Sequence, residues 1–309
     1  MRSKFENVND LPEKPKIEPA KNLSNRELIN LSITSKYHLK LFQPLIDVRK
    51  LLHHVTRGEH DAVKAMLKKD KSLIFKRGIV TDCSGREFEN ISAFEYALWA
   101  LDKHMWAAMI ACIPQNEEGR KVFERLIAQY NKVNTDGVTY KLNGETITEQ
   151  HFDFNNTIIK ELQTQIDLIN EPGVKNWAAI DKQWIEGVGS AQNLFPMHVV
   201  YEYCRSDEPF YPVPKFTSQP KSSKQFFNWI TVKDENWFSV DSKLSVDFAV
   251  YKGQHGGAWG RAAAGGMAGR ADLAAVTALC KVRTKDFIDL ESQLKAQITP
   301  DNRHQPSQI

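Results

Sequence analysis

The stretch LLHHVTRGEHDAVKAMLKKDKSLI, residues 51–74, decides the expected fold of the N-terminal half. Apolar residues at the spacing of one helix face run into it from upstream: Leu45, Val48, Leu51, Leu52 and Val55. Gly58 then ends the first helix, and a second helix is expected over 61–73, with Val63, Met66 and Leu67 turned inward. Two helices joined by a short glycine turn predict a helical hairpin.

A second helical pair is predicted by DCSGREFENISAFEYALWALDKHMWAAMIACI, residues 82–113. Ser92 can cap the first free amides of a helix, and Glu95, three residues later, can reach back to form a capping box. One helix is expected over 93–101 and the next over 103–113, where Pro114 stops it. The pattern therefore repeats the helical hairpin.

These two segments resemble ankyrin repeats over roughly residues 40–114. The sequence departs from the ankyrin pattern in having Ser-Ala-Phe at 92–94 where Thr-Pro-Leu is usual, and Asp-Lys-His at 102–104 where a second Gly-His turn would lie. An unrelated bundle of helical hairpins would show the same apolar spacing, so both architectures stay open. The ankyrin resemblance implies a stack whose concave surface binds proteins.

The predicted fold class is α+β, with ankyrin-like helical hairpins, an inserted β-hairpin, and a smaller mixed α+β unit after them. The segment TYKLNGETIT, residues 139–148, alternates around Asn143-Gly144, a pair typical of a type I′ hairpin. The expected segments are a flexible leader at 1–24, an ankyrin-like domain at 25–172, an α+β domain at 173–298 and a flexible tail at 299–309.

Composition restricts the classes of function. The chain has 309 residues with 41 basic and 38 acidic side chains, a balance too even to favour a nucleic-acid partner. No signal peptide and no apolar run long enough for a transmembrane segment is found in the sequence. Its four cysteines are widely spaced, which favours a reducing, cytoplasmic compartment.

Three further segments carry a wider resemblance: AQNLFPMHVVYEYC at 191–204, DFAVYKG at 247–253 and RADLAAVTALCKVRTKDF at 270–287. They are similar to a group of uncharacterised ankyrin-containing proteins from intracellular bacteria with type IVB (Dot/Icm) secretion. The resemblance spans most of residues 45–290. It implies an effector that is delivered into the host-cell cytosol and acts on a host protein there, and it implies no known chemistry.

His198 and Glu202 are the candidate catalytic residues. Four positions apart on a helix, they share one face, where a carboxylate could orient an imidazole for acid–base chemistry. A structural histidine packed among the neighbouring aromatic residues is the alternative. Cys204 and His151 complete no second close ligand pair, so a metal site is not predicted, and no cofactor is implied.

A glycine-rich loop, residues 253–269, is the other candidate for chemistry. Its HGG resembles the oxyanion loop of lipase-like hydrolases, but the sequence lacks the GxSxG pentapeptide that those enzymes need. The amides of Gly256 and Gly257 could instead hold a phosphate beside Arg261 and Arg270, ahead of a helix expected from Asp272. A surface loop without a ligand is the alternative.

The favoured function is protein binding through the helical platform. Trp99, Lys103, His104 and Trp106 lie around the turn of the second helical pair, and partly exposed tryptophans there would anchor a partner protein. Core packing is the alternative for both tryptophans. The competing function is an enzyme, a transferase or hydrolase, that uses His198 and Glu202 together with loop 253–269.

Overall fold

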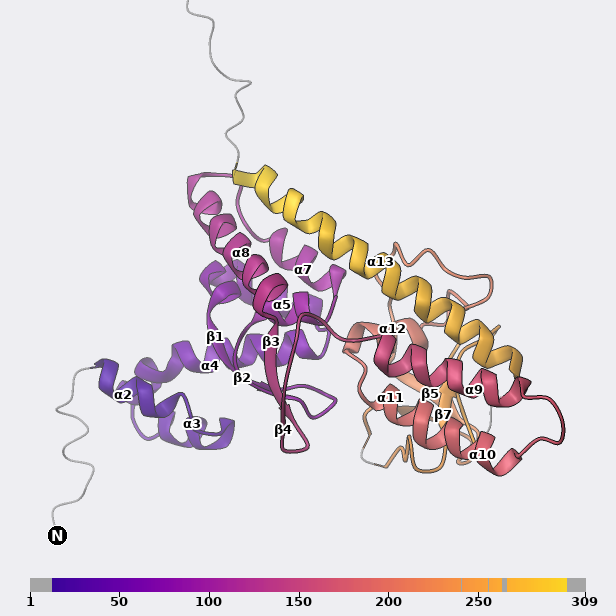
Figure 1. Ribbon diagram of the computed structural model, residues 1–309. Coiled ribbons are helices and arrows are strands. Elements are labelled where there is room, and N and C mark those ends of the chain that lie inside the picture. Colours follow the sequence, from indigo (N-terminus) through magenta and orange to yellow (C-terminus); the bar gives the residue numbers. More distant parts are fainter. Residues whose placement is uncertain (1–12, 240, 255, 263–265, 299–309) are drawn as a thin grey trace, which may run out of the picture.

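The computed structural model describes residues 13–239, 241–254, 256–262 and 266–298. The described chain is mixed α+β and 57% helical. Figure 1 shows the N-terminal and C-terminal halves side by side, with the long helix α13 running along both. The expected tail at 299–309 and the first twelve residues of the expected leader lie outside the described residues.

The N-terminal half places its helices around one face of a sheet. Its helices are α2 (Glu13–Ala20), α3 (Asn25–Ser32), α4 (Lys36–Thr56), α5 (His60–Lys69), the 3₁₀ turn η1 (Lys71–Phe75), α6 (Ala93–Trp99), α7 (Lys103–Ile110) and α8 (Glu117–Asp136). The antiparallel sheet has the order β1 (Arg77–Thr81), β2 (Glu87–Ser92), β3 (Val138–Leu142) and β4 (Glu145–Glu149). Gly78 permits close packing with α4, since a Cβ there would lie 2.9 Å from Val48 Cγ1.

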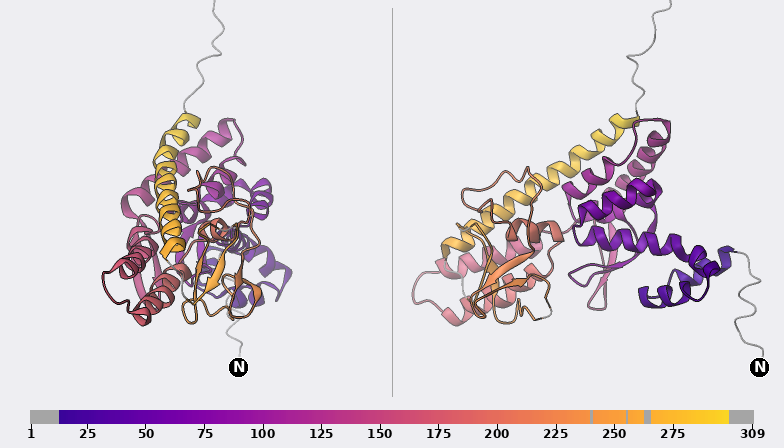
Figure 2. Two further views of the ribbon diagram at one scale, coloured as in Figure 1. Left: turned by 90° about the vertical axis from the view of Figure 1, so that its right-hand side faces the viewer. Right: turned by 180° about the vertical axis from the view of Figure 1, so that it is seen from behind.

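The C-terminal half packs short helices against a second small sheet. Its helices are the π-helical turn η2 (Asn155–Ile159), α9 (Lys160–Asn170), α10 (Trp177–Lys182), the π-helical turn η3 (Gln183–Val188), α11 (Gly189–Asn193), α12 (Met197–Cys204) and α13 (Gly266–Ile298). The sheet has the order β6 (Lys233–Asn236), β5 (Gln225–Asn228), β8 (Trp259–Arg261) and β7 (Ala249–Tyr251). Strand β7 lies against α11 and η3. Figure 2 shows the molecule from two further sides, with the second sheet in orange.

One hydrophobic core connects the two halves. It contains buried side chains from Val48 to Leu294, and α13 contributes to it while packing on α8 of one half and α9 of the other. The apolar side chains of α13 repeat every three or four residues: Ala275, Val276, Leu279, Phe287, Leu290 and Leu294. Helix α13 therefore ties the C-terminal half to the N-terminal half.

Several structural elements form where local sequence signals predict them. The Ser92 capping box is present, with the Glu95 amide donating to Ser92 Oγ and the Ser92 amide donating to Glu95. The hairpin at β3 and β4 turns at Asn143 and Gly144, both with positive φ. The helical pairs α4–α5 and α6–α7 also form, but an ankyrin arrangement of these pairs is not confirmed.

Two expectations differ from the structure. Residues 13–20 of the expected flexible leader form α2, because Ala20 packs in a small apolar cluster with Leu28, Leu41 and Phe42. The segment between the two helical pairs, for which no strand is predicted, forms β1 and β2, since Val80 and Phe88 pair across the strands and face the core. A separate finding concerns membranes: among the described residues, the helices include none with an apolar stretch sufficient for a transmembrane span.

Candidate functional site

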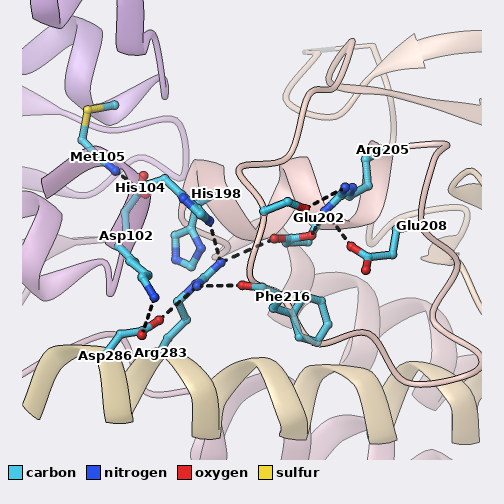
Figure 3. Close-up of polar contacts among 12 residues, drawn as sticks. Asp102, His104, Met105, His198, Glu202, Arg205, Glu208, Phe216, Arg283 and Asp286 are labelled. Carbon is cyan, nitrogen blue, oxygen red and sulfur yellow. Dashed lines mark hydrogen bonds and ion pairs between the residues drawn. The ribbon is translucent and has the colours of Figure 1, made fainter. Parts of the chain in front are cut away.

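Helix α12 carries both candidate catalytic residues and is buried along its whole length. It begins after Pro196, whose ring cannot continue a preceding helix, and all eight of its side chains lie inside the protein. The spacing of His198 and Glu202 on this helix is as expected. Their side chains meet an interior network rather than solvent (Figure 3).

His198 is held by a backbone carbonyl of the N-terminal half. Its Nε2–H donates to the Ala100 carbonyl at 2.7 Å, which leaves Nδ1 as the unprotonated ring nitrogen. Burial lowers the pKa of His198 to about 4, so the ring is neutral near pH 7. In this state His198 fixes α12 to the turn after α6.

Glu202 pairs with two arginines and not with His198. Its Oε2 accepts from Arg205 Nη1 at 3.3 Å, and its Oε1 lies 3.6 Å from Arg283 Nη2. Burial raises the pKa of Glu202, while the two guanidinium groups oppose that rise. No hydrogen bond or ion pair joins His198 to Glu202 among the described residues, so the expected acid–base pair is not formed.

Arg283 on α13 is the centre of the network. Its Nη1 donates to the Phe216 carbonyl at 3.1 Å and to Asp286 at 3.2 Å, and its Nη2 donates to His104 Nε2 at 3.1 Å. Lys103 Nζ donates to the other oxygen of Asp286 at 2.6 Å. Ionic contacts thus run continuously from α7 through α13 to α12 (Figure 3).

Lys252 and Asp272 satisfy backbone groups beside this network. The buried Lys252 Nζ donates to the carbonyls of Glu202 at 2.7 Å and Arg205 at 2.8 Å, at the C-terminal end of α12. Burial lowers the pKa of Lys252 to about 8. Asp272 accepts the amide of Gly253 at 2.6 Å and that of Lys252, and burial raises its pKa to about 7.

Replacing Asp272 by asparagine should change how stability depends on pH. A carboxyl whose pKa is higher in the folded than in the unfolded state contributes stability below about pH 4 that is lost as the pH rises through about 7. Asparagine stays neutral at both pH values. The free energy of unfolding of the Asp272→Asn variant, relative to that of wild type, should therefore rise by on the order of 2 kcal/mol between about pH 5 and about pH 8. Urea unfolding at both pH values measures this change.

Asp289→Asn on the exposed side of the same helix is the matched control and should show little pH-dependent difference from wild type. A constant difference between wild type and Asp272→Asn at both pH values would contradict the raised pKa.

The predicted phosphate loop is not assembled in the described residues. Its two arginines contact different segments: Arg270 donates to Asn170 Oδ1 at 2.5 Å, and Arg261 lies over the Trp229 ring at 5.8 Å. Gly256 approaches the Ser206 carbonyl, whereas Gly257 has open space beside it. Helix α13 begins at Gly266 rather than Asp272, and residues 255 and 263–265 lie outside the described residues.

The tryptophans of the predicted protein-binding face are buried rather than partly exposed. Trp99 and Trp106 are 0% and 3% exposed, because Tyr140 and Glu149 of the β3–β4 hairpin contact Trp99 while α5 and α13 pack on α7. Lys103 and His104 are half-buried in contacts with Asp286 and Arg283. These four residues join elements of the interior and present no tryptophan to a partner.

Sequence reasoning missed Arg283, Lys252 and Asp272. One signal was available for Arg283: it falls on the repeat of apolar residues along α13, four positions after Leu279 and four before Phe287. A charged residue on the buried apolar face of a helix predicts a buried hydrogen-bonding or ionic partner. For Lys252 and Asp272 no local pattern gives their pairing, since they come from a strand end and a helix twenty residues apart.

The geometry makes this network a structural centre. His198 and Glu202 line none of four surface hollows in the N-terminal half. Within the described parts of the chain, no group of three or more His, Cys, Asp and Glu residues is placed to hold a metal ion. The contacts found here stabilise the junction between the two halves.

The comparisons with known proteins agree on one family. Residues 157–294 match the family model of the CBUA0006 C-terminal domain. The chain is 36% identical over 266 residues to the "Uncharacterized protein CBUA0006" of Coxiella burnetii (strain RSA 493 / Nine Mile phase I), covering 78% of this chain and 73% of that protein. No solved structure matches the chain. The expected relationship to proteins of an intracellular bacterium is confirmed, while the ankyrin, effector and secretion expectations stay predictions.

Proposed function

Since the chain belongs to the CBUA0006 family, we propose that it is a protein-binding module that acts on a protein of a host cell. The surface that makes the contact lies within the domain that the family model matches. The tip of the β5–β6 hairpin, with strand β8 beside it, makes the contact. A relative from an intracellular bacterium supports the host as the source of the partner.

The observation that carries this proposal is an aromatic patch at the surface, in which Phe227 and Trp259 are half-buried and the other members are exposed. The aromatic patch is defined as Phe227, Trp229, Ile230, Val232 and Trp259. At the hairpin tip Trp229 is 49%, Ile230 53% and Val232 68% exposed. The Trp229 and Trp259 rings stack with centroids 5.5 Å apart, and Phe227 lies edge-on to both at 5.4 Å. Exposed, clustered aromatic side chains favour a protein interface over ordinary surface.

Hydrogen bonds within the β5–β6 turn support the backbone that carries the aromatic patch. Val232 donates its amide to the Asn228 carbonyl at 2.7 Å, and the Ile230 amide donates to Asn228 Oδ1 at 2.9 Å. Glu235 accepts from Asn228 Nδ2 at 3.0 Å and from Thr231 Oγ1 at 2.6 Å. A surface that is already ordered loses less conformational entropy on binding, which favours affinity.

Binding is better supported than catalysis. Trp and Arg are the residues that most often dominate interface energies, and Arg261 lies directly over Trp229. The enzyme alternative needs His198 and Glu202 to reach a substrate, but both are buried and bonded to structural partners. No feature of the described residues favours that alternative specifically.

The test is affinity purification from eukaryotic cytosol with quantitative mass spectrometry. We expect Trp229→Ala combined with Ile230→Ser to lose a specifically retained protein, with affinity reduced at least about tenfold, while its melting temperature changes little. The matched control is Ile288→Ser, which alters an equally exposed apolar side chain on α13. If the folded patch variant retains every specific partner, the aromatic patch is not the interface.

A further inference from the structure

A groove lies beside the first strand of the N-terminal sheet, far in sequence from the aromatic patch. It consists of two adjoining hollows of about 750 Å³ and about 500 Å³. Both are lined by Asn22 of the α2–α3 linker, Ile79 of β1 and Glu89 of β2. The groove therefore lies between the linker and the β1–β2 pair, with β1 nearer the open edge of the sheet.

Strand β1 is an edge strand. In the described sheet it pairs with β2, and no strand of the described chain lies on its other side. Unpaired backbone groups at a sheet edge are a template for the addition of another strand. Helix α4 packs on β1 through Val48 and Leu52, which meet Gly78 at the core face of the sheet.

Arg49 of α4 holds the α2–α3 linker, which forms the wall of the groove opposite β1. Its buried guanidinium donates to Asn25 Oδ1 at 3.1 Å and to the carbonyls of Lys21 at 2.9 Å and Ala20 at 3.4 Å. These bonds tie both ends of the linker to the same helix that packs on β1. The groove is thus part of the folded structure.

The larger hollow is rich in positive charge. Five basic residues line it, with Glu89 as the one acidic residue: Lys21, Arg49, Lys76, Arg77 and Arg125. Asp70, Glu95 and Glu18 offset Lys76, Arg77 and Lys21. Arg49 bonds only neutral groups, and the exposed Arg125 stacks on Phe75 at 3.9 Å with no carboxylate partner in the described chain.

The smaller hollow is lined by Glu87 and Glu89 and by no basic residue of the described chain, so only the larger hollow is basic. We propose that the larger hollow binds an extended, acidic peptide segment of a partner protein, which adds to β1 as a further strand. In an added strand alternate side chains point to the same side, so acidic residues at every second position could face Arg125 and Lys76. The backbone bonds of the added strand supply affinity, and the charges select acidic sequences. This site is separate from the aromatic patch and does not depend on it.

The experiment selects a displayed library of random twelve-residue peptides on the full chain. We expect acidic sequences to be enriched, and one enriched peptide to bind at least about tenfold more weakly to a Lys21→Glu, Arg125→Glu variant. Lys64→Glu, a charge reversal on α5 away from the groove, is the control and should bind normally. N-methylation at alternate peptide positions should weaken binding, and the β1 amides should exchange more slowly with the peptide bound.

Failure to enrich acidic peptides, or equal binding of the enriched peptide to the double variant and the control, would overturn the proposal. Loss of binding without any effect of N-methylation or any change at the β1 amides would also overturn strand addition. The Trp229→Ala, Ile230→Ser variant should bind the peptide as wild type does. A failure here is therefore distinguishable from a failure of the proposed interface at the aromatic patch.

Discussion

Replacing Arg283 by leucine should lower the free energy of unfolding by about 3–5 kcal/mol, because it removes one cationic partner each from the buried Glu202 and the half-buried Asp286. Glu202 would keep only Arg205, and Asp286 only Lys103, while the Phe216 carbonyl and His104 Nε2 would lose a donor. Urea unfolding followed by circular dichroism measures the loss. The variant tests whether the network holds α13 against α7 and α12.

Lys285→Leu is the control for this change, since Lys285 lies two residues away on the same helix and pairs with Asp289 in solvent. The control should lower the free energy of unfolding by less than about 1 kcal/mol. The double variant Arg283→Leu, Glu202→Leu should lose less free energy of unfolding than the two single variants lose in total, since the buried carboxylate is removed together with its partner. A loss below about 1 kcal/mol for Arg283→Leu would show that the network does not stabilise the junction.

Trp99→Ala should destabilise the protein by about 3–5 kcal/mol, the cost typical of removing a large aromatic side chain from a core. Its ring lies against Phe88 at 5.1 Å and Tyr140 at 5.5 Å, with the Arg86 guanidinium 5.1 Å from its centre. Its Nε1 also donates to Glu149 at 3.0 Å, and alanine would leave that carboxylate with Tyr140. Thermal and urea unfolding measure the effect.

Trp229→Ala is the matched change at an exposed tryptophan and should cost less than about 1 kcal/mol. The two variants separate folding from binding: Trp99→Ala lowers stability, and Trp229→Ala lowers partner retention in a folded protein. If Trp99→Ala kept wild-type stability, the packing of the β3–β4 hairpin over α6 would be wrong.

Signals confined to a few neighbouring residues predicted local structure well. The capping box of Ser92 and Glu95 and the Asn143-Gly144 turn depend on contacts within three or four residues, and both form as expected. The helix over 103–110 likewise begins at a capping residue, Asp102. In these places the residues that decide the structure are adjacent in the sequence.

Features that depend on distant segments could not be predicted in this way. The sequence leaves both partial exposure and core packing open for Trp99, because the residues that cover it, Tyr140 and Phe152, come 41 and 53 positions later. The capping of α12 by Lys252 joins residues about fifty positions apart. The exposure of Trp229 depends on where the turn between β5 and β6 falls, which no local sequence pattern shows.

The measurement that tests protein binding most directly is photo-crosslinking from the hairpin tip. A photoreactive phenylalanine analogue replaces Ile230 in one preparation and Ile288 on α13 in another, and each is irradiated in host-cell cytosol. The proposal predicts a covalent adduct with one protein from position 230, absent from position 288 and lost when Trp229→Ala is added. The same adducts from both positions, or none from position 230, would contradict it.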